Sequence, residues 1–463
     1  MRSRAIKVVL SVPVVAVVGW WLFADTVRYH YPERFAEPTI RFAHWGDFQD
    51  YRMWREIIAA FQQANPDLRV HQEYVVGFQG RYEAKIQQQL VAGDAPDVMM
   101  FQDEPFPTFA PRGFADLSEF LNTPGWSVDL TGDYFDTAVQ SFMHEGKPRG
   151  MPLFGGNVLI VWNKRCFERA DRVRGRPVRR PWDDWTLDDF LGICREVTID
   201  EDGDGRIDQF GLLLPGWVYY LPFMWSYGVE VLDETRTEWR MTGPAAVRVF
   251  DLFRRLRWVD HVCPTSVEQS EMLADTAFFT GRIAMCINGP WLQPFLNATS
   301  LGPREGHPPD YAVAHMPYGP TGRRYTRVTW DGLCLYDGLS PERKRRAWRF
   351  IHFVCGRAGQ DIVARHQRAI PALKISAETF KAHDLGTGAY RFVDAFSYSR
   401  VQPITRNWYP MDRKINEYLD LLKDNEITAA EFVERLAADP ALRRLFRVPG
   451  PAASAAAAKG APR

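Results

Sequence analysis

The chain has 463 residues, which is enough for two domains, because a single hydrophobic core rarely grows beyond about 250 to 300 residues. Its 57 basic and 57 acidic residues balance, so the sequence lacks the excess of Lys and Arg that nucleic-acid binding requires. No nucleic-acid partner is expected. Aromatic residues make up 14% of the chain, and rings that the core does not need are candidates for stacking surfaces.

The N-terminus has the pattern of an export signal. Basic residues at positions 2, 4 and 7 precede an apolar run from Val8 to Ala24. The run is long for a signal core and short for a membrane span, and the large Phe23 stands where a cleavage site needs a small residue. Residues 1–36 are therefore predicted to be a signal peptide or an N-terminal membrane anchor with a spacer, and an uncleaved anchor is favoured. The rest of the chain is expected in the periplasm.

Strand and helix patterns alternate in the first part of the exported chain. Apolar or alternating runs predict strands at 39–45, 68–76 and 97–101, and helical spacing of apolar residues predicts helices at 52–64 and 82–92. This alternation predicts a largely parallel sheet covered by helices.

The same pattern resumes further along. Thr186 with Asp189 predicts a capped helix start, and Ser340 and Gly356 predict the two ends of a later helix. The predicted strands are 156–163 and 210–214, and the predicted helices are 186–198, 245–259, 340–356, about 410–422 and 428–437. Residues 448–463 are low in complexity and predict a tail without a packed core.

Six cysteines follow the export signal. Three of them, Cys286, Cys334 and Cys355, lie inside apolar runs, where a free thiol behaves as a small hydrophobic group. Buried free thiols are favoured over a disulfide framework, and no C-x-x-C pair supports a redox or metal site.

Several segments in a fixed order resemble a known family. They are "TIRFAHWGD", "VAGDAPDVMMFQDEPFPTFAPRGFADLSEFL", "GMPLFGGNVLIVWNK", "FFTGRIAMCINGPW" and "DGLCLYDGLSPERKRRAWRFIHFVCG" followed by "RAIPALK". From about residue 39 to 440 the chain is similar to the extracellular solute-binding proteins of bacterial ABC importers, in the sugar-binding group that includes the maltose-binding protein.

The resemblance implies an α/β protein with the two-lobed type II periplasmic binding protein fold and three interlobe crossings. The crossings are expected near 151–156, 330–332 and 371–374, where Gly or Pro interrupts the pattern. The predicted boundaries are 37–153 with 331–371 for lobe 1 and 154–330 with 372–447 for lobe 2. The resemblance also implies a monomer that binds a carbohydrate in the cleft between the lobes, closes around it and delivers it to the permease subunits of an ABC transporter.

Candidate ligand-binding residues follow predicted strands or match the motifs of the sugar binders. Ligands of open α/β sheets lie beyond the carboxyl ends of strands, and sugars need carboxylates or amides at the rim and rings above the face. The candidates are Trp45, Asp47, Phe101, Glu104, Asn157, Trp217, Tyr219, Tyr220, Trp291, Asp331 and Trp408.

Each candidate also has a purely structural interpretation. Trp45, Trp291 and Trp408 would alternatively be core residues, and Asp47 and Glu104 would alternatively complement helix N-termini. Gly156 and Asn157 stand where the maltose binders place a carboxylate, which argues against a maltodextrin ligand.

An acidic loop, "DEDGDGRIDQFG" at 200–211, has the spacing of a calcium loop. Its ligands would be Asp200, Asp202, Asp204, Asp208 and the carbonyl of Arg206. Position 12 is Gly211, where an EF-hand has Glu, and a strand rather than a helix follows. Because similar loops in some sugar-binding relatives hold one Ca²⁺, the loop predicts a structural Ca²⁺ site, and an ion-free Asp-Gly turn is the alternative.

Two other functions remain open from the sequence. A tethered binding protein that reports to a sensory receptor would have the same landmarks, and a secreted carbohydrate-active hydrolase would also carry paired carboxylates. The sequence has no G-x-S-x-G, H-E-x-x-H or P-loop motif, so an enzyme is not expected.

Overall fold

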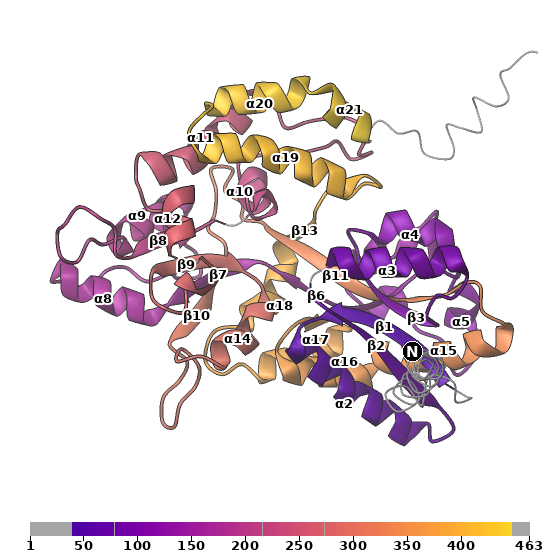
Figure 1. Ribbon diagram of the computed structural model, residues 1–463. Coiled ribbons are helices and arrows are strands. Elements are labelled where there is room, and N and C mark those ends of the chain that lie inside the picture. Colours follow the sequence, from indigo (N-terminus) through magenta and orange to yellow (C-terminus); the bar gives the residue numbers. More distant parts are fainter. Residues whose placement is uncertain (1–38, 78, 215, 273, 447–463) are drawn as a thin grey trace, which may run out of the picture. The chain divides into compact units, whose positions relative to one another are not determined.

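The computed structural model describes residues 39–77, 79–214, 216–272 and 274–446 (Figure 1). The predicted export segment and the low-complexity tail lie outside these residues. The described chain forms two compact units: unit 1 contains 39–100 with 335–351, and unit 2 contains 101–334 with 352–446. Within the described ranges, no helix is both long and apolar enough to span a bilayer.

Unit 1 is built on parallel strands, as the alternating pattern predicts. β1 pairs in parallel with β2, from Thr39 opposite Arg69 to Gly46 opposite Val76, and in parallel with β3 at Phe42 and Val98. The elements that contribute to this unit are β1 (Thr39–Gly46), α2 (Phe48–Ala64), β2 (Arg69–Val76), α3 (Gln79–Ala92), the first part of β3 (Val98–Gln102) and most of α15 (Pro341–Cys355).

Aromatic rings hold the core of unit 1 together. The Phe42 ring on β1 lies 4.5 Å from Trp54 on α2 and 5.2 Å from Phe350 on α15, measured between ring centroids. Trp54 belongs to the helical stripe that the sequence predicts, and it is fully buried. The helix therefore covers the sheet with the face that its apolar spacing specifies.

The described part of unit 2 contains strands of three sheets, and these strands are mostly antiparallel. β11 (Thr326–Leu335) pairs antiparallel with β6 (Met151–Asn157), which pairs antiparallel with β12 (Ile370–Pro371). The four-stranded sheet has the order β10-β7-β9-β8. Its strands are β7 (Leu159–Asn163), β8 (Phe210–Leu213), β9 (Ile283–Asn288) and β10 (Tyr311–Ala314), while β13 (Ser399–Val401) pairs with β11 and β4 (Met143–His144) with β5 (Lys147–Pro148).

The prediction of a largely parallel sheet is therefore wrong for unit 2. In the four-stranded sheet only β8 and β9 pair in parallel, whereas β7 pairs antiparallel with both β9 and β10. A parallel neighbour requires a strand–helix–strand crossover. The chain instead enters β7 directly from β6, with only Val158 between them, so β7 has no preceding helix to reverse its direction.

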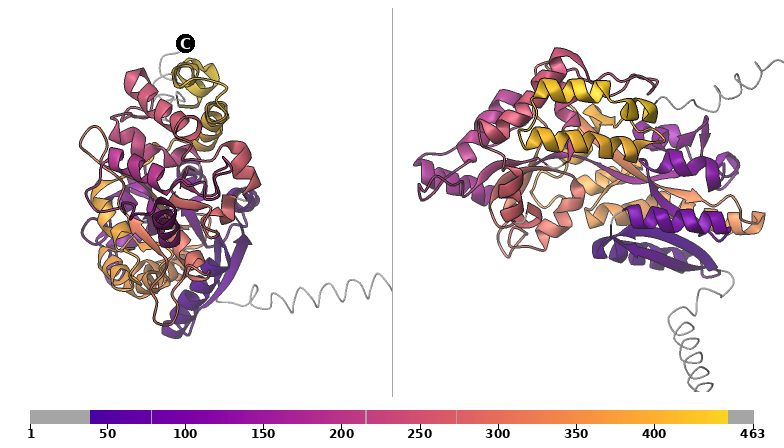
Figure 2. Two further views of the ribbon diagram at one scale, coloured as in Figure 1. Left: turned by 90° about the vertical axis from the view of Figure 1, so that its left-hand side faces the viewer. Right: turned by 45° about the horizontal axis from the view of Figure 1, so that its top comes forward.

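Helices cover the sheets of unit 2. α11, α19 and α20 pack against one another, as the views in Figures 1 and 2 agree. The helices of this unit are α4 (Phe106–Gly113), α5 (Ser118–Asn122), α6 (Leu130–Asp133), α7 (Asp136–Ser141), α8 (Lys164–Arg174), α9 (Leu187–Val197), α10 (Leu221–Ser226), α11 (Gly243–Trp258), α12 (Ser266–Glu271), α13 (Ala274–Ala277), α14 (Gln293–Asn297), α16 (Arg357–His366), α17 (Lys374–Ala382), α18 (Arg391–Asp394), α19 (Trp408–Lys423), α20 (Ala429–Ala438) and α21 (Pro440–Phe446), with short turns η2 (Trp217–Tyr219), η3 (Pro290–Leu292) and η4 (Ala395–Tyr398).

The compact units differ from the predicted lobes. Residues 101–153 were assigned to lobe 1 by the resemblance, whereas they pack within unit 2. The lobe boundaries and the three crossings stay predictions.

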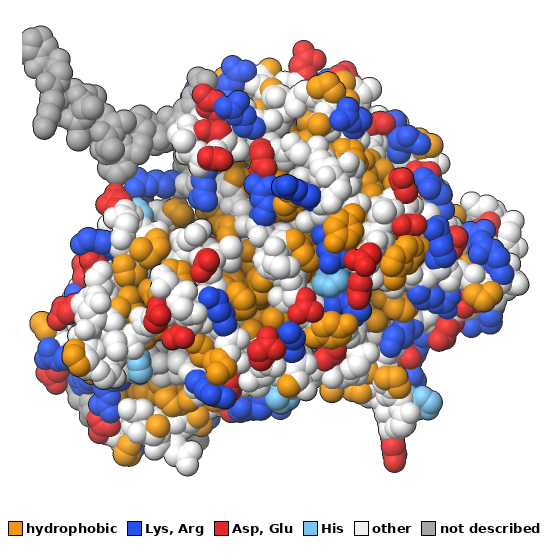
Figure 3. Space-filling model, turned by 180° about the vertical axis from the view of Figure 1, so that it is seen from behind, with side chains coloured by type: hydrophobic (Ala, Val, Ile, Leu, Met, Phe, Trp, Pro, Cys, Tyr) orange, Lys and Arg blue, Asp and Glu red, His pale blue; other side chains and the backbone are white. Residues whose placement is uncertain are grey.

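The described surface is mixed in charge. In the face shown in Figure 3, basic and acidic side chains are interspersed, in keeping with the balanced composition. All six cysteines are free and buried, which confirms the prediction made from their apolar neighbours.

Candidate ligand site

A hydrogen-bonded cluster of polar side chains lies inside unit 2; we call Glu104, Arg327 and Gln402 the Glu104 cluster. The Gln402 side-chain amide donates to Glu104 Oε1, and Arg327 Nη1 donates to Gln402 Oε1 at 2.9 Å. Arg327 Nη1 also lies 3.9 Å from Glu104 Oε1. The side chains of Arg327 and Glu104 are only 8% and 14% exposed, so little water screens this ion pair.

Three elements bring these side chains together. Glu104 follows β3 at its carboxyl end, Arg327 lies on β11, and Gln402 follows β13 directly. β13 pairs in parallel with β11, with Arg400 opposite Arg327, which places Gln402 close to the Arg327 side chain. The sheet register therefore builds the cluster.

Aromatic rings surround the Glu104 cluster. The Arg327 guanidinium lies over the Tyr219 ring, 5.2 Å from its centroid. The Trp408 side chain is hydrogen-bonded to Glu104, and its ring centroid is 5.6 Å from that of Trp217. The structure thus brings together four predicted residues, one carboxylate and three rings.

Burial controls the protonation of the acidic groups here. Burial raises the pKa of Glu104, while the Arg327 charge and the hydrogen bonds from Gln402 and Trp408 oppose that rise. Burial likewise raises the pKa of Asp412, whose Oδ1 accepts a hydrogen bond from the Trp217 indole.

Asp103, next to the cluster, is the most strongly affected acid. Burial raises its pKa well above the ordinary value, and the nearby charges of Glu104 and Asp331 raise it further. Its Oδ2 accepts from the Trp330 backbone N–H at 3.3 Å and from Ser141 Oγ at 3.5 Å. Asp331 lies on β11 and is 8% exposed. Its charge acts on Asp103, so this predicted residue lies near the cluster.

The Trp291 ring lies close to the backbone of Gly156, which has no side chain. A Cβ atom added at Gly156 would be 2.9 Å from Trp291 Cζ3 and 2.9 Å from Pro290 Cδ, closer than side chains tolerate. The absence of a side chain at Gly156 therefore leaves room for the rings of Trp291 and Pro290. The next residue, Asn157, is fully buried and donates from Nδ2 to the Phe392 carbonyl at 2.7 Å.

Four predicted rings of unit 2 occupy core positions, because Trp217 and Trp408 are only 1% and 2% exposed and Phe101 and Tyr220 are buried as well. The Phe101 ring packs 4.8 Å from Phe109 and 4.9 Å from Phe114, and it is 1% exposed. Tyr220 is fully buried, and its ring stacks on Phe253 at 4.3 Å. None of these rings presents a face outside the core in this structure.

The remaining two predicted residues belong to unit 1. Trp45 lies near the end of β1 and is half-buried. Asp47 is the N-cap of α2 and accepts from the backbone N–H groups of Gln49 and Asp50, while Asp50 accepts from the Asp47 N–H. This capping box is the structural role that the sequence offered as an alternative for Asp47.

The acidic loop gathers three of its carboxylates. One oxygen each from Asp200, Asp202 and Asp208 lie within 4.8 Å of one another, and Asp204 is not part of this group. The same side chains also hold the turn: Asp200 accepts from the N–H groups of Gly203 and Gly205. Carboxylate oxygens at this spacing fit the ligand preference of Ca²⁺.

Sequence reasoning missed Arg327, Gln402 and Asp412. Arg327 did leave a signal, because a charged residue inside the buried run "RVTWDGLCL" requires a partner. Gln402 and Asp412 lie in polar surroundings that are ordinary for a surface, and no pattern distinguishes them.

Comparison with known proteins identifies the fold class first. The ABC substrate-binding protein from Listeria monocytogenes in complex with cycloalternan superposes with a TM-score of 0.74 at 19% identity, covering 88% of this chain and 97% of that chain. The maltose-bound protein from T. maritima superposes with a TM-score of 0.71 at 20% identity, covering 88% and 99%. The chain therefore has the α/β fold of the two-lobed periplasmic binding proteins.

The family follows from the sequence match. The model of the bacterial extracellular solute-binding protein family matches residues 45–361, so the chain belongs to this family. A protein from Brucella abortus (strain 2308), named only as a binding protein, is 24% identical over 331 residues, which cover 70% of this chain and 74% of that protein. Membership of an extracellular family makes this an exported protein.

Proposed function

We propose that the chain is the solute-binding component of an ABC importer and that it binds a carbohydrate at the Glu104 cluster. The observation that carries the proposal is the pairing of the Glu104, Arg327 and Gln402 side chains with the half-buried Tyr219 ring, over which the Arg327 guanidinium lies. Saccharides need both kinds of group, because their hydroxyls hydrogen-bond at the rim while their C–H faces stack on rings.

An additional donor supports this placement. Arg327 Nε is buried and has no hydrogen-bond partner among the described residues, and an unpaired buried donor is costly. A ligand hydroxyl in contact with Arg327 would accept from it. Several solved relatives of this fold are bound to saccharides, among them the complexes with cycloalternan and maltose.

A saccharide titration tests the proposal. Maltose, trehalose, cellobiose and glucose are titrated into the full chain, and binding is followed by saturation-transfer NMR. Glu104→Gln removes a charge-assisted acceptor and should weaken binding roughly 10- to 100-fold, and Tyr219→Ala should weaken it roughly two- to tenfold. Tyr219→Phe keeps the ring and should bind as the wild type does. Unchanged binding in Glu104→Gln and in Tyr219→Ala, with both folds intact, would show that the ligand lies elsewhere.

The two alternatives, a carbohydrate-active hydrolase and a binding protein that reports to a sensory receptor, have less support than import. The family consists of binding proteins, so the proposal includes no catalytic step. A sensory receptor as partner in place of a permease is not favoured by the relatives, which are substrate-binding proteins.

The acidic loop is proposed to hold one structural Ca²⁺ through Asp200, Asp202 and Asp208. The grouping of their oxygens supports this, and the ligand set would be completed by other oxygens of the loop, including the Arg206 carbonyl. The ion would brace the connection between α9 and β8.

The N-terminal segment is proposed to be an uncleaved anchor. Only the sequence supports this, through the basic residues before Val8–Ala24 and the large Phe23 at the expected cleavage point. Mass spectrometry of the mature N-terminus tests it, because cleavage would remove the anchor.

A further inference from the structure

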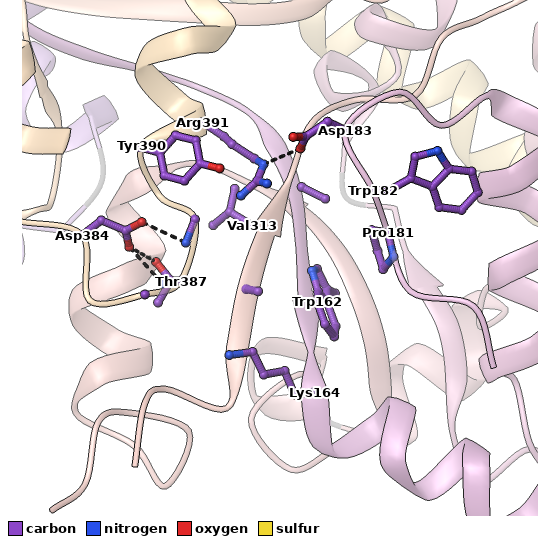
Figure 4. A pocket seen from close by; sticks show the side chains of 14 residues that line it. Trp162, Lys164, Pro181, Trp182, Asp183, Val313, Asp384, Thr387, Tyr390 and Arg391 are labelled. Carbon is purple, nitrogen blue, oxygen red and sulfur yellow. Dashed lines mark hydrogen bonds and ion pairs between the residues drawn. The ribbon is translucent and has the colours of Figure 1, made fainter. Parts of the chain in front are cut away.

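A cavity lies in unit 2 at the edge strand β10; we call it the β10 pocket. It has a volume of about 330 Å³ and is lined by β10, the end of β7 and the loops around 181–183 and 384–391. Figure 4 shows Trp162 and Pro181 on one side of the strand that carries Val313, and Tyr390, Asp384 and Thr387 on the other. This volume is at the lower end of the range for small-molecule pockets.

None of the side chains of the Glu104 cluster lines this pocket. β7 pairs antiparallel with β9, and its first residue, Leu159, lies opposite Asn288, three residues before Trp291. Trp162 lies near the other end of β7, and Lys164 is the first residue of α8. At about 3.3 Å per residue the two ends of the strand are roughly 13 Å apart. Trp291 is accordingly not among the residues that line the β10 pocket.

The loop that forms one wall is held in place without any ligand. The Asp384 carboxylate accepts from Thr387 N and Oγ1 at 2.9 and 2.8 Å and from Gly388 N at 3.0 Å. The Thr387 carbonyl accepts from the Val313 N–H at 2.8 Å, which fastens the loop to β10. Gly388 has φ +80°, and a Cβ there would come 2.2 Å from Arg391 Nη1. The glycine thus leaves room for the Arg391 side chain.

An ion pair closes one end of the pocket. Arg391 Nε donates to Asp183 Oδ1 at 2.8 Å, and the guanidinium also lies 4.7 Å from the centroid of the Tyr390 ring. Figure 4 shows this pair reaching across from one loop to the other. Both groups keep hydrogen-bonding capacity, because a guanidinium has five N–H donors and a carboxylate about four acceptor positions.

The charges of the pocket balance. Lys164 and Arg391 are opposed by Asp183 and Asp384, and the Lys164 ammonium already donates to the Pro309 carbonyl at 2.8 Å. An anion would need a net positive charge that this pocket lacks. A neutral ligand with many hydroxyls suits the half-buried rings of Trp162 and Tyr390 together with the donors and acceptors at the rim.

We propose that the β10 pocket is a second carbohydrate-binding site, which takes one or two rings of a neutral saccharide. The saccharide stacks on Trp162 and Tyr390, and its hydroxyls bond to Asp183, Arg391 and Lys164. This proposal goes beyond the proposed function and does not depend on the Glu104 cluster being the transport site.

The test uses the full chain with Glu104→Gln as background, so that binding at the Glu104 cluster is weakened. Saturation-transfer NMR follows titrations of maltose, trehalose and cellobiose, with glucose 6-phosphate as an anionic probe. Binding of a neutral saccharide should persist in this background at millimolar concentrations. Adding Tyr390→Ala or Asp183→Ala should raise its dissociation constant roughly two- to tenfold. Tyr390→Phe, which keeps the ring, and Asp188→Ala, an exposed acid outside the pocket, are the matched controls and should change nothing.

The two proposals fail in distinguishable ways. If the wild type binds saccharide and the Glu104→Gln protein binds none, the β10 pocket is overturned and the Glu104 site stands. If Tyr390→Ala weakens the binding and Glu104→Gln does not, the pocket is supported and the Glu104 site is wrong. Preference for glucose 6-phosphate, equal binding in Tyr390→Ala and Tyr390→Phe, or no saccharide binding at all would overturn the pocket. Thermal unfolding of each variant shows that the fold is intact.

Discussion

Asp103 is a carboxyl group whose ionisation the fold disfavours. Its pKa is raised chiefly by burial, and Glu104 and Asp331 add two unfavourable charges. In the unfolded chain, the group ionises at its ordinary pKa. The stability that the protonated group provides is therefore complete below that pKa and is lost as the pH rises through the raised pKa of the folded state.

Replacement of Asp103 by Asn should change the pH dependence of stability. The amide cannot ionise, so Asp103→Asn should gain stability relative to the wild type as the pH rises from about 4 to 7, and the two proteins should converge at lower pH. Urea unfolding at a series of pH values measures the difference. Ser141→Ala removes a neighbouring hydroxyl without removing a titrating group, so its profile should run parallel to that of the wild type. A constant difference between Asp103→Asn and the wild type would contradict the assignment.

The role of an individual residue was predictable where it depends on neighbouring positions in the sequence. Glu104 and Tyr219 follow strands or match the motif, and both lie against the Arg327 side chain. Asp47 matched the motif equally well, yet its carboxylate caps α2, because a carboxylate one position before a helix serves either purpose. The sequence around Gln402 could not reveal its partner, since that contact depends on the pairing of β13 with β11.

At the scale of elements, local signals predicted helices better than strand direction. Thr186 and Asp189 form the predicted capping box, and α9 begins at Leu187. Capping and apolar spacing act within one or two turns, so the sequence alone specifies them. The antiparallel pairing of β7 with β9 joins segments over 120 residues apart, and nothing local encodes it.

The acidic loop gives a prediction for metal removal. If Ca²⁺ is bound, excess EGTA should lower the thermal midpoint of the wild type, because an ion at 100 times its dissociation constant contributes about 2.7 kcal/mol. Asp208→Asn should shrink the difference between the midpoints with and without chelator. Asp204→Asn, outside the group of three oxygens, should shrink it less. Identical wild-type midpoints with and without EGTA would favour the ion-free turn.

Across the whole molecule, the six thiols behave alike. Each is buried, and burial raises the pKa of Cys166, Cys263 and Cys286 to about 12. Thiolate is the reactive form, so both access and ionisation oppose modification of the folded protein.

Counting the reactive thiols tests whether all six cysteines are free and protected in the folded protein. An aromatic disulfide reagent at pH 8 should label no thiol in the native protein within minutes and all six after unfolding in guanidinium chloride without reductant. Fewer than six labelled thiols in the unfolded chain would reveal a disulfide. Rapid labelling of the native protein would show that a thiol is more accessible than the structure indicates.

The organisation into compact units was only partly predictable. The likeness to two-lobed binding proteins gave the fold, and residues 101–153 fall in the compact unit 2. Membership in a unit depends on the sum of many distant contacts, among them the hydrogen bond from Trp330 N to Asp103 across 227 positions. Sequence motifs identify local elements, but they do not specify the distant contacts that decide to which unit a segment belongs.

In an exported protein with six unpaired thiols, folding competes with oxidation of the cysteines. Outside the cytoplasm an exported chain meets oxidants that can pair its cysteines while they are still accessible. Burial ends that exposure, so the yield of active protein depends on collapse of the core being faster than oxidation, which takes seconds to hours. Once folded, the protein needs no disulfide-forming catalyst and loses nothing when the redox potential around it changes. Its vulnerability to oxidants is concentrated in the interval between export and folding.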